Sequence, residues 1–359
     1  MRIAVIGATG YSGTEALRLL ATRTDLEVVW VGSHTQAGKT VKTVLPQLQN
    51  TRLSDLVFAD YTSPSAFPEG TEVVLLALPH GEALQIVPQL IEQDLRVIDF
   101  SGDFRLDKTA YEKWYGRPWD TMHSGKAVYG LPELNKKWIK DAVLIANPGC
   151  YATTSALALL PLVEAGWIDC SRIMIDAKSG VSGAGKAPTT GTHFVEVQES
   201  LRAYKVGTHQ HTPEIEQTLL EARRRWLAAE YGASDSERPT VLMTTQLLPI
   251  RRGIYVTAYA ELHDGIDIEQ EELYTLYTKR YEQEPFVQVL PIGQVPEIRY
   301  VVGTNLCQIG LHVDHRTRTV LVMATLDNLI KGAAGQAIQN LNIMGDLGEA
   351  TGLPIDPWF

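Results

Sequence analysis

Cysteine is scarce in this chain of 359 residues, and its few copies are widely spaced. Only Cys150, Cys170 and Cys307 are present, and no two of them form a CxxC pair. This scarcity argues against a disulfide scaffold and against a zinc site built on cysteines. We therefore expect no bound metal and a reducing, cytoplasmic setting.

Long apolar runs and an excess of positive charge are lacking as well. No stretch reaches the roughly 20 apolar residues of a membrane-spanning helix, and the opening MRIAVIGATG has neither the basic start nor the apolar core of a signal peptide. A net charge of −10 argues against nucleic acid as a partner. With 45% hydrophobic and 21% charged residues, the chain has the composition of a globular protein and the length of two domains.

A glycine-rich turn lies near the N-terminus, between an apolar strand (2–7) and an amphipathic helix (14–22). Its glycines recur every third residue in GATGYSG. The first permits a tight turn, the second lets backbone approach a pyrophosphate, and the third lets the helix pack on the strand. The helix N-terminus then favours the anion. This pattern predicts a dinucleotide site formed by Gly7, Thr9, Gly10, Tyr11, Ser12 and Gly13.

The second strand (27–32) indicates which dinucleotide binds. An NAD site usually places Asp or Glu at the end of this strand, to bind the ribose 2′-hydroxyl. Here Ser33 and His34 follow the strand, and Lys39 comes shortly after. Hydroxyl groups and a cation suit a 2′-phosphate, so we predict NADP(H) as cofactor, with Ser33 and Lys39 as contacts. An ordinary polar loop with one lysine is the alternative.

Strands and helices continue to alternate up to residue 149. A strand (73–78) ends at Pro79-His80-Gly81, a helix (82–93) follows, and then another strand (95–102). Such alternation is typical of a Rossmann-type, doubly wound parallel sheet. Pro79 should then lie at the carboxyl edge, near the cofactor, whereas His80 either lines the site or makes a structural hydrogen bond.

Cys150 follows the turn Asn147-Pro148-Gly149, between an apolar strand and an Ala/Leu-rich helix. The thiol therefore falls in the first turn of a helix, where backbone N–H groups and the helix dipole lower the pKa of a cysteine. We predict that Cys150 is a nucleophile. A buried cysteine that acts as a small hydrophobic residue is the alternative.

Beyond Cys150 the apolar pattern changes to period two, in strands such as 171–178, 241–248, 253–262 and 319–326. This pattern predicts an α+β domain with a mixed, largely antiparallel sheet, one face packed and the other available to a second subunit. We expect a cofactor-binding domain at 1–149, with a C-terminal helix (327–359) packing back on it, and a catalytic and dimerisation domain at 150–326. A flexible loop (179–188) interrupts the strands.

His209 and His211 precede another helix. One of them would serve Cys150 as general acid/base. Alternatively, both are loop histidines that bind backbone or the helix end.

Several motifs together resemble one enzyme family along the whole chain. They are GATGYSGTEALRLL, SGDFRL, YGLPEL, NPGCYATT, SGVSGAGK, HQHTPEIEQ and DNLIKGAAGQAIQNLN. The sequence is similar to the N-acetyl-γ-glutamyl-phosphate reductases, which belong to the aspartate-semialdehyde dehydrogenase superfamily. The resemblance implies NADPH-dependent reduction of N-acetylglutamyl 5-phosphate to the 5-semialdehyde through a Cys150 thioester, with release of phosphate, in arginine biosynthesis. It also implies a homodimer or homotetramer.

The resemblance further implies roles for individual residues. Cys150 is the nucleophile and His209 the catalytic histidine, although His211 remains a candidate for that role. Arg252 resembles a substrate-binding arginine, and the adjacent Arg251 leaves open which of the two faces the substrate. The other residues expected at the substrate are Arg105, which would bind the acyl phosphate, Asn147, His211 and Glu214. Those expected at the cofactor are Ser179, Gly180, Gly183 and Asn328.

Three alternatives remain open from the residues. A related enzyme of lysine biosynthesis uses the same catalytic parts on an aminoadipyl phosphate bound to a carrier protein. Aspartate-semialdehyde dehydrogenase shares the fold, but it has its histidine on a later strand, and the strand at 253–262 contains none. A non-catalytic NADP-binding redox sensor would use Cys150 as its sensing thiol.

Overall fold

The computed structural model describes residues 1–62, 67–121, 127–231 and 238–358, which divide into two units. The first unit comprises Met1–Pro148 and Ala333–Leu353, and the second comprises Gly149–Gly332 and the residues from Pro354 onward. Residues 327–332 and the C-terminal tail, which we expected in the first domain, therefore group with the second unit. The reason is local bonding, since Asp327 binds Arg252 and the backbone of Trp358 binds that of Val302.

The first unit contains a parallel sheet whose order, among the described residues, is β3-β2-β1-β4-β5-β7-β6. Its strands are β1 (Arg2–Ile6), β2 (Glu27–Gly32), β3 (Phe58–Ala59), β4 (Val73–Leu76), β5 (Arg96–Asp99), β6 (Val128–Tyr129) and β7 (Leu144–Ala146). The order reverses between β1 and β4, and ligands of such sheets bind at the carboxyl ends of the strands on either side of this point. The predicted doubly wound sheet is confirmed.

Helices of the first unit include a C-terminal one that is buried along its entire length, α10 (Gly335–Met344). It contacts α1, α5 and β5. The other helices are α1 (Tyr11–Ala21), α2 (Val41–Val44), η1 (Pro46–Leu48), α3 (Ala83–Ile91), α4 (Lys108–Tyr115) and α5 (Pro132–Ile139). A π-helix, η5 (Ile330–Ala334), precedes α10.

The second unit contains a mixed sheet whose described strands follow the order β12-β13-β14-β11-β8-β10-β9. The strands are β8 (Ile168–Gly180), β9 (Arg202–Tyr204), β10 (Val241–Leu248), β11 (Ile254–Leu262), β12 (Val287–Val289), β13 (Cys307–Asp314) and β14 (Thr319–Leu326). Only the pairs β8–β10 and β12–β13 are parallel among them. The expected period-two pattern is confirmed in β11, where Ile254 and Val256 are buried and Tyr255 and Thr257 are partly exposed.

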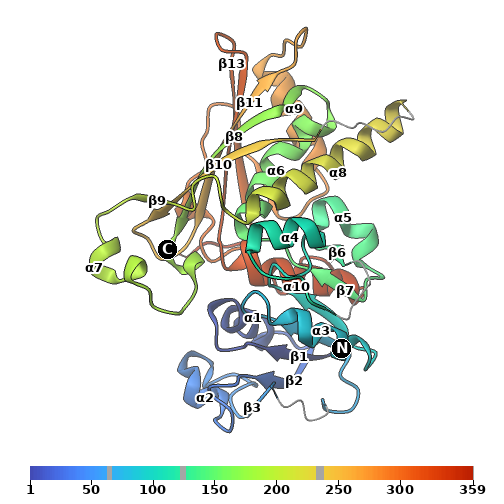
Figure 1. Cartoon of the computed structure of the whole chain (residues 1–359), viewed down its shortest axis with the longest axis vertical. Coiled ribbons are helices and arrows are strands. Elements are labelled where there is room, and N and C mark those ends of the chain that lie inside the picture. The colour runs from blue at the N-terminus through green and yellow to red at the C-terminus, as the bar shows by residue number, and fades with distance from the viewer. Residues whose placement is uncertain (63–66, 122–126, 232–237, 359) are drawn as a thin grey trace. The chain divides into compact units, whose positions relative to one another are not determined.

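Helix α6 (Cys150–Glu164) and helix α8 (His211–Tyr231) lie side by side against one face of this sheet (Figure 1). Helix α9 (Gln270–Tyr281) contacts α6 as well. Pro161 lies inside α6 and has no N–H for the carbonyl of Leu157. The hydroxyl of Tyr281 donates to that carbonyl at 2.6 Å, so α9 supplies the missing hydrogen bond.

Short helical segments complete the second unit: η2 (Val181–Ala184), η3 (Thr190–Thr192), α7 (Phe194–Val197) and η4 (Ile298–Tyr300). In the part of the chain that the structure describes, no helix combines the length and the apolar character required to cross a membrane.

Candidate active site

Cys150 is the first residue of α6 and directly follows the N-cap residue Gly149. Gly149 has extended dihedral angles (φ −72°, ψ 149°), and no side chain caps the first turn. Backbone N–H groups of this turn therefore remain directed at the surroundings of the thiol, where they favour an anion. The thiol is partly exposed, and the described cysteines are thiols rather than disulfides. This position suits a nucleophile.

Glu214 holds the turn that carries Cys150. Its side chain is fully buried in the first turn of α8, and its Oε1 accepts a hydrogen bond from the N–H of Gly149 at 2.7 Å. His211 packs against the same glycine, since a Cβ atom at position 149 would collide with its imidazole. Gly149 is thus required for the close approach of α8, and two of the expected substrate residues lie beside the cysteine turn.

His209 is buried next to His211, with the centres of the two rings 4.6 Å apart. The backbone N–H of His211 donates to Nδ1 of His209 at 3.1 Å. A nitrogen that accepts this bond carries no proton, so the neutral imidazole has its proton on Nε2. His209 therefore presents Nε2–H as a hydrogen-bond donor.

Two tyrosines that no sequence motif singled out surround His209. Tyr151 and Tyr204 have ring centres 5.3 and 5.9 Å from that of His209, and their hydroxyl groups lie 3.1 Å apart. Burial raises the pKa of Tyr204 to about 12 and also raises the pKa of Tyr151, so both phenols are neutral at physiological pH. Tyr151 directly follows the cysteine, which was the available sequence signal.

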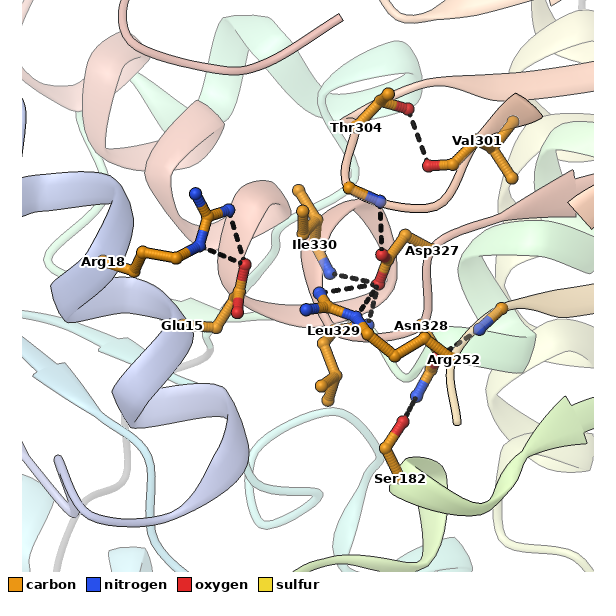
Figure 2. A network of polar contacts seen from close by, with 12 residues as sticks. Glu15, Arg18, Ser182, Arg252, Val301, Thr304, Asp327, Asn328, Leu329 and Ile330 are labelled. Carbon is orange, nitrogen blue, oxygen red and sulfur yellow. Dashed lines mark hydrogen bonds and ion pairs between the residues drawn. The ribbon is translucent and has the colours of Figure 1, made fainter. Parts of the chain in front are cut away.

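Arg252 is almost fully buried, whereas the neighbouring Arg251 is exposed. Nε and Nη2 of Arg252 bind Oδ1 of Asp327 at 3.2 and 3.0 Å, as Figure 2 shows. The indole of Trp358 lies 4.9 Å from the guanidinium carbon of Arg252. Of the two arginines, Arg252 is therefore the one held in a fixed orientation.

Ser179, Gly180, Gly183 and Asn328, which the sequence places at the cofactor, lie at or just after the ends of β8 and β14. Asn328 accepts a hydrogen bond from Gly253 N–H at 2.8 Å and donates to Ser182 Oγ at 2.9 Å (Figure 2). Ser179 is buried, and a Cβ atom at Gly183 would come within 2.8 Å of its Oγ.

Gly180 has a different reason to be a glycine. A Cβ atom there would lie 2.8 Å from the backbone nitrogen of Arg252. The backbone of β8 and that of the Arg251–Arg252 segment can therefore run close together only with glycine at position 180.

The glycine turn of the first unit has the form expected for a pyrophosphate site. Gly7 has φ +74°, and a Cβ atom at Gly13 would collide with the Gly7 carbonyl. A Cβ atom at Gly10 would meet only the Gly7 carbonyl oxygen, at 3.5 Å, so backbone is open to approach there. Gly10 is the N-cap of α1, and no side chain caps the helix that begins at Tyr11. These residues fit a dinucleotide.

The remaining residues expected at the cofactor lie on the loops after β1, β2 and β4. Ser33 is buried, with its Oγ 3.2 Å from Oγ1 of Thr9. Lys39 is exposed and donates to Gln36 at 3.0 Å, and Pro79 is exposed. His80 accepts a hydrogen bond from Gly102 N–H at 2.8 Å, which is the structural alternative considered for it.

Arg105 and Asn147 both make structural contacts within the first unit. Arg105 is 6% exposed, and it donates to the carbonyls of Asn147 and Phe100, both at 2.8 Å. Asn147 is 1% exposed; its amide donates to Ala333 O at 3.0 Å and accepts from Asn340 at 3.1 Å. These contacts hold both side chains in place, and the substrate-binding roles expected from the sequence stay predictions.

Asp99 is a buried carboxyl group at the end of β5 that the sequence analysis did not identify. Ser101 donates to it from Oγ at 2.7 Å and from N–H at 2.9 Å. Burial, together with the nearby carboxylate of Asp103, raises the pKa of Asp99 to about 7. The SGDFRL motif was the available signal. Within the described residues, no three His, Cys, Asp or Glu side chains are arranged to hold a metal ion.

Two family models cover most of the chain. Residues 2–142 match the NAD-binding domain of semialdehyde dehydrogenases, and residues 150–328 match their dimerisation domain. Among curated proteins, the N-acetyl-gamma-glutamyl-phosphate reductase of Bacillus cereus (strain B4264) is 44% identical over 361 residues, covering 100% of both chains. The enzyme of that name from Brevibacillus brevis is 43% identical and covers 100% of this chain and 99% of its own.

Solved structures show the same fold at low sequence identity. Aspartate semialdehyde dehydrogenase II from Vibrio cholerae has a TM-score of 0.70 and 18% identity, covering 96% of this chain and 98% of its own. Aspartate semialdehyde dehydrogenase with NADP from Candida albicans has a TM-score of 0.68, 18% identity and the same two coverages.

Proposed function

Because this chain belongs to the N-acetyl-γ-glutamyl-phosphate reductase family, we propose that it reduces N-acetylglutamyl 5-phosphate to N-acetylglutamate 5-semialdehyde, with NADPH, in arginine biosynthesis. The observation that carries the proposal is the position of Cys150 in the first turn of α6. It directly follows Gly149, whose N–H is bound by Glu214. Relatives of this name do not favour the carrier-bound lysine-pathway substrate or the redox sensor.

In the first step, the Cys150 thiolate attacks the γ-acyl carbon of the substrate. The bond between that carbon and the phosphate oxygen breaks, phosphate leaves, and a thioester forms on Cys150. Backbone N–H groups at the start of α6 stabilise the tetrahedral oxyanion, and one such donor is typically worth about 3 kcal/mol. Arg105, by the family resemblance, binds the phosphate group, for which a guanidinium is well suited.

In the second step, the thioester carbon becomes a thiohemiacetal oxyanion on Cys150. NADPH supplies the hydride for this reduction when it is bound. The oxyanion then expels Cys150 as thiolate and releases the aldehyde, so the cycle begins and ends with the same thiolate. His209 offers Nε2–H to the oxyanion and to the sulfur, in keeping with the tautomer that its Nδ1 contact imposes.

Arg252 binds the carboxylate of the N-acetylglutamyl group in this proposal. Asp327 holds the guanidinium from one edge, so Arg252 is oriented before the substrate arrives. Orientation of this kind lowers the entropy lost on binding. Arg251 is exposed, and its guanidinium carbon lies 5.9 Å from the ring centre of Trp358.

The first unit binds a nicotinamide dinucleotide. We assign NADP(H), because Ser33 and Lys39 lie on the loop after β2, where a 2′-phosphate would be held by hydroxyl groups and a cation. Lys39 is exposed, and its ammonium donates to the uncharged amide oxygen of Gln36. Such a bond competes weakly with a phosphate, so the lysine is able to turn to one.

We also propose a cytoplasmic homodimer or homotetramer. The second unit matches a dimerisation domain, and the sheet face opposite α6 exposes Met174 and Leu242. Sedimentation at micromolar concentration distinguishes the two states, and a monomer would contradict both.

The nucleophile is tested with Cys150→Ala. In the reverse direction, phosphate-dependent reduction of NADP with the semialdehyde should fall by more than about a thousandfold. The Kd for NADPH should stay near the wild-type value, because the glycine turn is unaltered. Mass spectrometry of wild-type protein trapped during turnover should find the acyl adduct on Cys150. Comparable turnover by the variant, or an adduct elsewhere, would remove the thioester.

Cofactor choice and substrate are tested separately. Wild-type kcat/KM should favour NADPH over NADH, and Lys39→Ala should reduce that preference. A wild-type preference for NADH would overturn the assignment and would point instead to Asp60, whose carboxylate lies 3.1 Å from His34. Turnover of N-acetylglutamyl phosphate without any carrier protein is expected, and a requirement for a carrier would exclude this substrate.

A further inference from the structure

The C-terminal tail, residues 354–358, is attached to one turn of the second unit. The carbonyl of Pro354 accepts a hydrogen bond from Asn305 N–H at 2.7 Å, and Trp358 N–H donates to the carbonyl of Val302 at 3.0 Å. Both ends of the tail are therefore anchored by backbone bonds to residues 302–305. These bonds place the indole of Trp358, the last residue that the structure describes.

The turn is shaped to receive this indole. Gly303, between the two anchor residues, has φ +89°, and a Cβ atom there would lie 2.6 Å from the indole ring. Any other residue would push the ring away, so glycine lets the indole lie directly on the backbone. Trp358 is 41% exposed, which means that burial of apolar surface alone does not account for its position.

The indole lies over the guanidinium of Arg252, whose central carbon is 4.9 Å from the ring centre. This distance is within the range in which an aromatic ring attracts a cation above its face. Asp327 binds Nε and Nη2 of the same guanidinium through Oδ1. Its other oxygen, Oδ2, accepts from Gly303 N–H at 2.8 Å. One carboxylate thus joins the arginine to the turn on which the tail is anchored.

We propose that Trp358 is a positioning residue for Arg252. Asp327 fixes one edge of the guanidinium and the indole fixes its plane, so that Arg252 meets the substrate carboxylate in a single orientation. The inference rests on the proposed function, in which Arg252 binds that carboxylate. Trp358 acts through Arg252.

The test uses Trp358→Leu, which keeps an apolar side chain but removes the ring, and Trp358→Phe, which keeps a ring. Trp138→Leu is the matched control, because Trp138 is also exposed but lies on α5 of the first unit. In the reverse reaction, Trp358→Leu should raise the KM for the semialdehyde about fivefold, with kcat and the KM for NADP within about twofold of wild type. Trp358→Phe should restore most of the difference, and Trp138→Leu should match wild type.

A double-mutant cycle with Arg252→Lys separates the positioning role of Trp358 from the substrate-binding role of Arg252. If Trp358 acts through the guanidinium, Trp358→Leu adds no further rise in KM to the Arg252→Lys variant. An equal rise in both backgrounds, or a wild-type KM for Trp358→Leu, overturns the inference and leaves the role of Arg252 intact. A wild-type KM for Arg252→Lys overturns the role of Arg252 and, with it, the inference. Thermal melting of each variant establishes that it is folded.

Discussion

Replacing Asp327 by asparagine should destabilise the second unit by about 3–5 kcal/mol, the usual cost of breaking a buried ion pair on one side. The carboxylate is fully buried, and its Oδ1 accepts hydrogen bonds from Nε and Nη2 of Arg252 at 3.2 and 3.0 Å. Its further donors are the backbone N–H groups of Leu329 (2.8 Å), Ile330 (3.2 Å) and, at Oδ2, Gly303 (2.8 Å). Asparagine has one oxygen for these donors, so its NH₂ group faces a donor, and the charge of Arg252 loses its partner.

The assay is urea unfolding followed by near-ultraviolet circular dichroism, with a thermal melt in parallel. A loss of this size should lower the melting temperature of the second unit by about 10 °C. Asp267→Asn is the control, because it makes the same chemical change in the same unit at a side chain that is 89% exposed and 4.0 Å from His315. It should leave the midpoint unchanged. A loss below about 1 kcal/mol for Asp327→Asn would refute the reasoning, since it would be close to the roughly 0.5 kcal/mol of ordinary surface substitutions.

Three further predictions concern the glycine turns and the buried carboxyl group. Gly10→Ala should weaken cofactor binding, measured by calorimetry, and leave the melting temperature unchanged. Gly13→Ala should weaken cofactor binding and also lower the melting temperature, because its Cβ atom collides with the preceding turn. Identical behaviour of the two variants would contradict their assigned roles. Burial raises the pKa of the Asp99 carboxyl group from 3.8 to about 7. The folded protein therefore binds the carboxyl proton more tightly than the unfolded chain does. The stability that this gives is present below about pH 4 and is lost as the pH rises through 7. Asp99→Asn should flatten that fall in unfolding free energy, and an unaltered slope between pH 4 and 7 would exclude Asp99 as its source. Gly149→Ala should displace the His211 imidazole and reduce kcat about 10–100-fold at an unchanged Kd for NADPH; a wild-type kcat would show that the position of His211 does not matter.

Much of the fold could be predicted because its elements have strong local patterns. The strand expected at 253–262 is β11 (Ile254–Leu262), and the helix expected at 82–93 is α3 (Ala83–Ile91). The parallel pairing of β8 with β10 could not be predicted, because period-two alternation identifies a strand but not its neighbour. Nor could the grouping of residues 327–332 with the second unit, which depends on the bonds of Asp327.

The candidate site was predictable where the chemistry is local. Pro148 and Gly149 end a strand and begin a helix, and this is enough to put Cys150 in a first turn. The ion pair that distinguishes Arg252 from Arg251 could not be predicted, because the partner of Arg252 lies 75 residues away in the sequence. A motif likewise cannot show burial, such as the almost complete burial of Asn147.

Two buried carboxylates explain why the reactive groups of the second unit hold their places. A carboxylate loses much free energy when it leaves water, and hydrogen-bond donors in the protein interior offset that loss. Glu214 binds the turn that carries Cys150, and Asp327 binds Arg252 together with three backbone N–H groups. In both cases the donors include backbone N–H groups of a glycine turn or of a helix start, which cannot rotate away as side chains do. The nucleophile and the arginine are therefore oriented by contacts that exist before a substrate binds, so that substrate binding energy is not consumed in ordering them.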